Sequence, residues 1–364
     1  MGDDHFSDPR FKIMETISVA KQSNVFKALL VDSQMCVAVK QVINDQIDSN
    51  DVQMRFNMET DIQNQFDNPF IVPIYEKKTV GNSTVFIMEY LPAKSLADYI
   101  LAYKIDENEV KIKFLEILAA LEYIHKEHKI VHRDIKLDNI LLDKNHHIRL
   151  GDFGFSKLVE SEHHNSTLCG TVYYLPPELI AKEDYSFYSD IWSLGVTLYA
   201  MVTQELPFHN LNMPALFKQI QFSDFNDPPQ ASPELKDLIR KMLAKDPQKR
   251  ITIDQIRSHS WIQQNPLNTF LWDDYKLRLH QCDGLEDKIR KRNELTEIIN
   301  EKINKILEPS VPSKNIKAQQ RKSEPISNLQ NRSPITKFPP GQRVNKQSSI
   351  NKNFPQIQIN KNHH

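Results

Sequence analysis

The 364-residue sequence contains little cysteine and little glycine, and its net charge is close to zero. Its three cysteines are Cys36, Cys169 and Cys282, and their wide spacing fits neither a disulfide framework nor a zinc site. The formal net charge of -1 gives no global electrostatic reason to bind nucleic acid or a membrane surface. We therefore expect a reducing compartment, the cytoplasm or alternatively the nucleus.

Long apolar runs are also missing. No run approaches the roughly 18 residues that a transmembrane helix needs, so no membrane span is expected. Hydrophobic residues make up 40% of the chain and charged residues 26%, which is typical of a folded globular protein. There are only eight glycines, and this scarcity affects one loop that is discussed below.

The residue pattern predicts a small β-rich part followed by a larger helical part. Short β-branched and apolar runs between residues 11 and 41, and again over 85–91, are typical of strands. Apolar residues at helical spacing predict helices over 51–66, 110–126, 189–203, 233–243 and 252–259. We therefore expect an α+β fold with two lobes, an N-lobe over 11–88 and a C-lobe over 92–262, separated by a cleft.

Beyond residue 262 the composition changes twice. Residues 263–308 are expected to form a helical extension, because a stripe of apolar residues recurs along it: Leu285, Ile289, Leu295, Ile299, Ile303 and Ile306. Residues 309–364 carry ten Lys and Arg and a single acid, Glu324, without any periodicity. Such a segment buries too little apolar surface to offset its ordering entropy, so a disordered basic tail is expected.

Two partners are conceivable for the predicted helix over 285–307. Its basic stretch at 288–292 suggests a calmodulin-binding or autoinhibitory element. However, acids at 286, 287, 294, 297 and 301 dilute that basic face. A coiled coil, or a helix packed back on the large lobe, is the favoured alternative.

Two polar loops lie between short apolar segments in the C-lobe. The first is His-Arg-Asp-Ile-Lys-Leu-Asp-Asn at 132–139, and the second is Gly-Asp-Phe-Gly at 151–154. Together with Pro-Pro-Glu at 176–178 and Asp-Ile-Trp-Ser-Leu-Gly at 190–195, they resemble the catalytic loop, metal-binding loop and activation-segment end of eukaryotic protein kinases. The resemblance covers residues 11–262 and implies the bilobal protein kinase fold.

The resemblance is strongest to the Ser/Thr branch, because Lys136 stands two residues after Asp134 and Gly170-Thr171 follows later. Within that branch, the loops are similar to the calcium/calmodulin-dependent and AMP-activated kinase group, and the activation segment also resembles that of Aurora kinases. It implies a serine/threonine protein kinase that transfers the γ-phosphate of ATP, with Mg²⁺, to protein substrates.

In this family pattern, Asp134 orients the substrate hydroxyl and Lys136 stabilises the transferred phosphate. Asn139 and Asp152 hold the Mg²⁺ ions, which prefer oxygen ligands. Lys40 contacts the α- and β-phosphates and pairs with Glu59. The remaining nucleotide contacts implied by the resemblance come from Val25, Ala38, Met88, Glu89, Leu91 and Leu141.

The resemblance also implies regulatory and structural residues. Thr167 occupies the usual phosphorylation position of the activation segment, and Arg133 and Lys157 are the basic partners that a phosphate there would recruit. An upstream activating kinase is the corresponding partner. Asp190 is expected to brace the catalytic loop, and a Glu178–Arg250 pair is expected to be buried.

The chain departs from the family in its nucleotide loop. Val25 matches the valine that closes the family's G-x-G-x-x-G-x-V motif, and the three glycine positions then fall on Ser18, Ala20 and Ser23. Each Cβ restricts the backbone that closes over the phosphates, so weaker nucleotide binding is expected. A pseudokinase scaffold or a weak ATP binder is therefore the alternative to an active enzyme.

Overall fold

The computed structural model describes residues 8–19, 23–43, 66–153, 156–158, 172–263 and 278–307. Among the predicted features, Glu59 and most of its helix, Ala20, Thr167 and the basic tail lie outside the described residues. None of the described helices is long and apolar enough to cross a bilayer.

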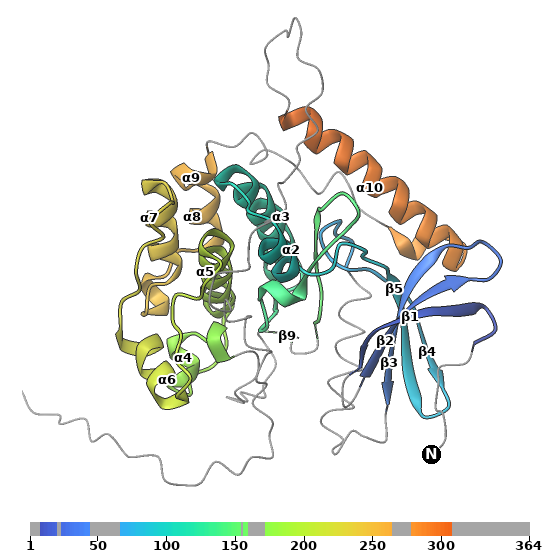
Figure 1. Cartoon of the computed structure of the whole chain (residues 1–364), viewed down its shortest axis with the longest axis horizontal. Coiled ribbons are helices and arrows are strands. Elements are labelled where there is room, and N and C mark those ends of the chain that lie inside the picture. The colour runs from blue at the N-terminus through green and yellow to red at the C-terminus, as the bar shows by residue number, and fades with distance from the viewer. Residues whose placement is uncertain are drawn as a thin grey trace, which may run out of the picture.

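The small lobe is built on a five-stranded antiparallel sheet with the order β1-β2-β3-β5-β4 (Figure 1). Its strands are β1 (Phe11–Val19), β2 (Ser23–Leu30), β3 (Cys36–Ile43), β4 (Ile74–Val80) and β5 (Ser83–Glu89). Alternate side chains of β3 and β5 point to one face, where Val37, Val39, Val85 and Ile87 are fully buried. The predicted β-rich lobe is therefore confirmed.

The large lobe is mainly helical, as predicted. Its helices are α2 (Leu96–Ala102), α3 (Glu107–Lys126), α4 (Pro177–Ile180), α5 (Phe187–Thr203), α6 (Met213–Phe222), α7 (Pro233–Met242), α8 (Ile253–Arg257) and α9 (Ser260–Gln263). Asp106 caps the N-terminus of helix α3, and its side chain accepts a hydrogen bond from the Glu109 backbone N–H. Helix α5 passes through the centre of the lobe, and its residues from Ser189 to Met201 are all buried.

Four short strands position the two polar loops. They are β6 (Ile130–Val131), β7 (Ile140–Leu142), β8 (Ile148–Leu150) and β9 (Lys157–Leu158), which form the antiparallel pairs β6–β9 and β7–β8. The first loop runs from the end of β6 to the start of β7, and the second follows β8. The strand pairs therefore bring loops that are separated in sequence to one end of the cleft.

Helix α10 (Leu285–Leu307) has the bounds predicted from its apolar stripe, and a short 3-10 turn over Leu279–Gln281 precedes it. It extends diagonally from the sheet of the small lobe towards the large lobe (Figure 1). Ile289 is buried in the small-lobe core, whereas Ile299 and Ile303 are buried in the large-lobe core. The prediction of packing on the large lobe alone was therefore incomplete, because the stripe is shared between both lobes.

Candidate active site

The first polar loop is held compact by its own side chains. Lys136 Nζ lies 2.7 Å from Asp134 Oδ2, and Asn139 Nδ2 donates to the same carboxylate oxygen at 2.9 Å. Asn139 Nδ2 also donates to the backbone oxygen of Asp134 at 2.8 Å. Because the amide nitrogen makes these bonds, the amide oxygen of Asn139 is the atom that remains to ligate a cation.

The backbone of this loop is braced by Asp190 from helix α5. Its carboxylate accepts hydrogen bonds from the backbone N–H groups of His132 at 2.8 Å and Arg133 at 2.9 Å. Arg133 has a φ of 72°, a left-handed conformation that is unfavourable for a residue with a long side chain. The predicted bracing role of Asp190 is confirmed, and its two bonds help to maintain the strained backbone.

His132 links the first loop to the second. It is fully buried, and this burial lowers the pKa of its imidazole, which favours the neutral form. Its Nε2 lies 3.2 Å from the backbone oxygen of Gly151, which can only accept, so the proton resides on Nε2. Nδ1 then accepts from the backbone N–H of Asp134 at 3.4 Å. A single neutral histidine therefore connects the two loops.

The second loop presents Asp152 to the cleft. Asp152 has a φ of 58°, and its side chain is 29% exposed. Lys40 Nζ, from strand β3 of the small lobe, lies 4.0 Å from Asp152 Oδ1. Phe153 is fully buried, with its ring 4.6 Å from that of His132 and 5.0 Å from that of Phe66. Asp152 is therefore partly exposed and faces Lys40 of the small lobe, while the buried Phe153 anchors the loop in the core.

The two predicted metal ligands are brought together by the backbone. The N–H of Gly151 donates to the backbone oxygen of Asn139 at 2.9 Å, so Asp152 follows directly after a residue bonded to Asn139. A carboxylate and an amide oxygen suit Mg²⁺, which usually takes one or two protein ligands and completes its shell with phosphates and water. The described residues contain no cluster of three or more His, Cys, Asp or Glu that could hold a metal by itself. The donor set therefore fits a metal brought with a phosphate substrate.

Strand register shows how the predicted nucleotide-contact residues of the small lobe are arranged. Val25 lies opposite Lys40 across β2 and β3, and Ala38 lies opposite Met88 across β3 and β5. Leu141 lies on β7 in the large lobe. Val25, Ala38 and Met88 thus lie on paired strands of the small lobe, and Glu59, the predicted partner of Lys40, is outside the described residues.

Glu89 and Leu91, two of the predicted nucleotide contacts, belong to the hinge, residues 89–91. The side chain of Glu89 has a second set of partners, which sequence reasoning missed. Its Oε2 atom lies 3.0 Å from Arg292 Nε and 3.3 Å from Arg149 Nε. No local pattern signals these partners, because they lie far from residue 89 in the chain.

The regulatory residues are only partly described. Arg133 stacks its guanidinium 3.9 Å from the ring centroid of Tyr185, another contact that sequence reasoning missed. Lys157 pairs with Val131 between β9 and β6, next to the catalytic loop. The predicted buried pair is confirmed, since Arg250 donates to both carboxylate oxygens of Glu178 at 2.7 and 2.9 Å.

Comparison with known proteins identifies the family. The model of the protein kinase domain matches residues 11–262. The human NUAK family SNF1-like kinase 1 is 34% identical over 280 residues, which cover 76% of this chain and 41% of that protein. Serine/threonine-protein kinase SIK1 of Mus musculus is 37% identical over 232 residues, which cover 63% of this chain and 30% of that protein.

A plant protein is also similar to this chain. The carbon catabolite-derepressing protein kinase of Secale cereale is 40% identical over 198 residues, which cover 54% of this chain and 39% of that protein. The chain thus matches less than half of the length of each of these relatives. The matched region contains both polar loops and the cleft between the lobes, and it shows that the chain belongs to the protein kinase family.

Proposed function

We propose that the protein is a serine/threonine protein kinase that transfers the γ-phosphate of ATP to hydroxyl groups of protein substrates. The observation that carries this proposal is the cluster of Asp134, Lys136 and Asn139 next to Asp152, with Lys40 facing it from the other lobe. The names of the three relatives, all kinases, support the same activity.

In the proposed reaction, the substrate oxygen forms a bond to the γ-phosphorus, and the bond to the β-phosphate oxygen breaks to release ADP. Asp134 orients the hydroxyl and accepts its proton. Lys136 lies within hydrogen-bond reach of Asp134, so its charge acts at the point where the phosphoryl group is transferred. Asn139 and Asp152 would hold Mg²⁺, which would supply charge neutralisation of the phosphate oxygens.

The decisive test is phosphate transfer by the full chain from γ-labelled ATP to a generic protein substrate. Asp134→Asn keeps the size of the side chain but removes its charge, so transfer should fall by roughly 100-fold or more. Asp32→Asn, at an exposed position in the turn after β2 and outside both polar loops, is the matched control and should retain activity. Absence of transfer by the unaltered chain, with normal nucleotide binding, would favour a pseudokinase scaffold.

We also propose that the nucleotide loop limits ATP affinity. Strands β1 and β2 pair as far as Val19 and Asn24, so regular strand structure extends into the loop. The double variant Ala20→Gly, Ser23→Gly should lower the KM for ATP, because glycine widens the accessible backbone. An unchanged KM would show that the missing glycines have no effect on nucleotide binding.

Regulation by phosphorylation of Thr167 is proposed on the position of Arg133. The Nε atom of Arg133 is buried without a hydrogen-bond partner among the described residues, and its backbone belongs to the catalytic loop. A phosphate on Thr167 would pair with this guanidinium and order the activation segment. Thr167→Ala should then reduce transfer after treatment with an activating kinase, whereas full activity would indicate a segment that needs no phosphate.

A further inference from the structure

Helix α10 connects the two lobes behind the hinge. Near its start, Leu285 and Ile289 pack in the small-lobe core, and Lys288 Nζ donates to the Tyr75 backbone oxygen at 2.7 Å. Near its end, Ile299 and Ile303 are buried in the large-lobe core. The relative position of the two lobes therefore determines whether both ends of the helix can dock at once.

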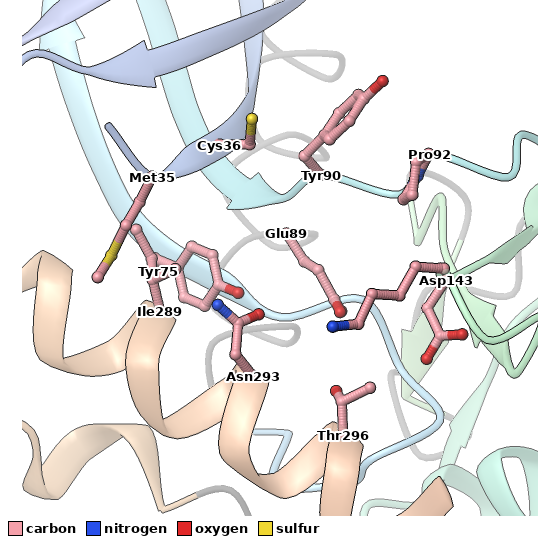
Figure 2. A pocket seen from close by; sticks show the side chains of 11 residues that line it. Met35, Cys36, Tyr75, Glu89, Tyr90, Pro92, Asp143, Ile289, Asn293 and Thr296 are labelled. Carbon is pink, nitrogen blue, oxygen red and sulfur yellow. The ribbon is translucent and has the colours of Figure 1, made fainter. Parts of the chain in front are cut away.

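The middle of α10 contacts the hinge itself. Figure 2 shows the side chain of Glu89 pointing towards Asn293 and Thr296 of the helix across a pocket that Ile289 and Tyr90 also line. Arg292 is fully buried next to these residues. It donates from Nε to Glu89 Oε2 at 3.0 Å and from Nη2 to the Pro69 backbone oxygen at 2.8 Å.

The charge of Arg292 makes this contact energetically important. Burial, together with the like charge of Arg149, lowers the pKa of Arg292, and the charge of Glu89 opposes that shift. A guanidinium nevertheless stays protonated, so its charge must be compensated inside the protein. Its Nη1 atom has no hydrogen-bond partner among the described residues. Compensation therefore depends on the hinge carboxylate of Glu89.

The contact continues from the hinge to the metal-binding loop. Arg149, also buried, lies on β8 three residues before Asp152. Its Nε is 3.3 Å from Glu89 Oε2, and its Nη2 donates to Thr296 Oγ1 of α10 at 3.2 Å. Helix α10 thus contacts the strand that ends in Asp152 as well as the hinge.

We propose that Arg292 is a positioning residue for the nucleotide site and that docking of α10 and binding of ATP stabilise each other. This inference rests on the proposed kinase function. The expected sign of this coupling, tighter ATP binding when α10 is docked, follows from the arrangement of the site in the structure with the docked helix. There Lys40 lies 4.0 Å from Asp152, and Phe153 is fully buried. Helix α10 therefore belongs to the catalytic unit, which extends beyond residue 262 to include 285–307.

The first test uses the unaltered full chain and hydrogen–deuterium exchange of backbone amides. Coupling between two sites is reciprocal, so a non-hydrolysable ATP analogue with Mg²⁺ should slow exchange within 285–307 as well as in the hinge, by about fivefold or more. Protection of the hinge with unchanged exchange in α10 would overturn the inference and leave the kinase proposal intact. Absence of protection at both sites would contradict both.

The second test separates positioning from simple stabilisation. In Arg292→Met, the Kd of a fluorescent ATP analogue and the KM for ATP should rise about fivefold or more, with kcat at saturating ATP changed less than twofold. Arg292→Lys keeps the charge but not the fork of donors, so it should show a smaller rise. Lys302→Met removes an equivalent charge from an exposed position of the same helix and should behave like the unaltered chain.

Folding of each variant is checked by circular dichroism. Thr296→Val removes only a hydroxyl, which accepts from Arg149 and donates to the Arg292 backbone oxygen. It should also raise the KM for ATP, and it provides the test if Arg292→Met does not fold. An unchanged Kd and KM in folded Arg292→Met, or in Thr296→Val where the former does not fold, would overturn the inference. A loss confined to kcat would overturn it as well.

Discussion

The ion pair between Glu178 and Arg250 permits a stability prediction whose magnitude follows from burial. The Arg250 side chain is fully buried, and that of Glu178 is 3% exposed. Arg250 also donates to the backbone oxygens of Tyr188 at 2.7 Å and Ala244 at 3.1 Å. Replacing Arg250 with methionine leaves the carboxylate of Glu178 with one remaining hydrogen-bond donor in the described part of the chain, the Ser189 hydroxyl at 3.2 Å.

Removing one partner of a buried ion pair typically costs about 3–5 kcal/mol. Because a folded protein is stable by only about 5–15 kcal/mol, Arg250→Met should consume a large part of the free energy of unfolding. The double variant Glu178→Gln, Arg250→Met removes both charges. It should be at least about 1 kcal/mol less destabilising than the sum of the two single changes.

Urea unfolding followed by tryptophan fluorescence measures these differences. Arg250 Cζ lies 5.2 Å from the ring centroid of Trp192, so this buried tryptophan reports on the same region. Arg240→Met is the control, because Arg240 is mostly exposed and surface pairs contribute about 0–1 kcal/mol. If Arg250→Met costs no more than Arg240→Met, or if the double variant is additive, the reasoning about burial is wrong.

Two further changes test packing and protonation. A Cβ at Gly195 would lie 2.9 Å from Met242 Cβ, so Gly195→Ala should force α5 and α7 apart and reduce stability by about 1–3 kcal/mol in thermal unfolding; an unchanged melting temperature would contradict this. Burial disfavours protonated His147, but the charge and hydrogen bond of Glu116 outweigh it and raise the pKa of His147 above its ordinary 6.5. The native state therefore binds the proton more tightly, so this stabilisation is complete below pH 6.5 and is lost as the pH rises through the folded pKa. The stability difference between the unaltered chain and His147→Gln should accordingly shrink as the pH rises, and a constant difference would refute the assignment.

The local parts of the candidate site were predictable because their residues are close in sequence. Asp134, Lys136 and Asn139 lie within six positions, and the strands on either side were recognisable from short apolar runs. Helix α10 was predicted with its observed bounds, since a long stripe at helical spacing is a strong signal. Helix α6 was missed, although Met213, Leu216, Phe217 and Ile220 recur at helical spacing and pack in the large-lobe core.

The features of the site that the sequence did not predict depend on contacts between residues that are far apart in the chain. Glu89 was predicted as a nucleotide contact, and nothing near it in the sequence predicts that its carboxylate meets Arg292, 203 positions later. An amphipathic stripe likewise specifies that a helix is buried on one face but not which surface covers it. The division of the α10 stripe between two cores requires the arrangement of the lobes, which no local pattern contains.

The hydrogen bonds of buried polar groups indicate that the folded unit extends beyond the region that matches the protein kinase family. Within the matched region 11–262, Arg149 donates to Thr296, His147 contacts Asn300 at 3.1 Å, and Glu89 accepts from Arg292. Buried polar groups are almost always paired, because an unpaired one loses its hydration without replacement. A chain ending at residue 262 would lose these partners at the hinge and at the strand before the metal-binding loop. The region that carries the chemistry is therefore shorter than the region that must fold to support it.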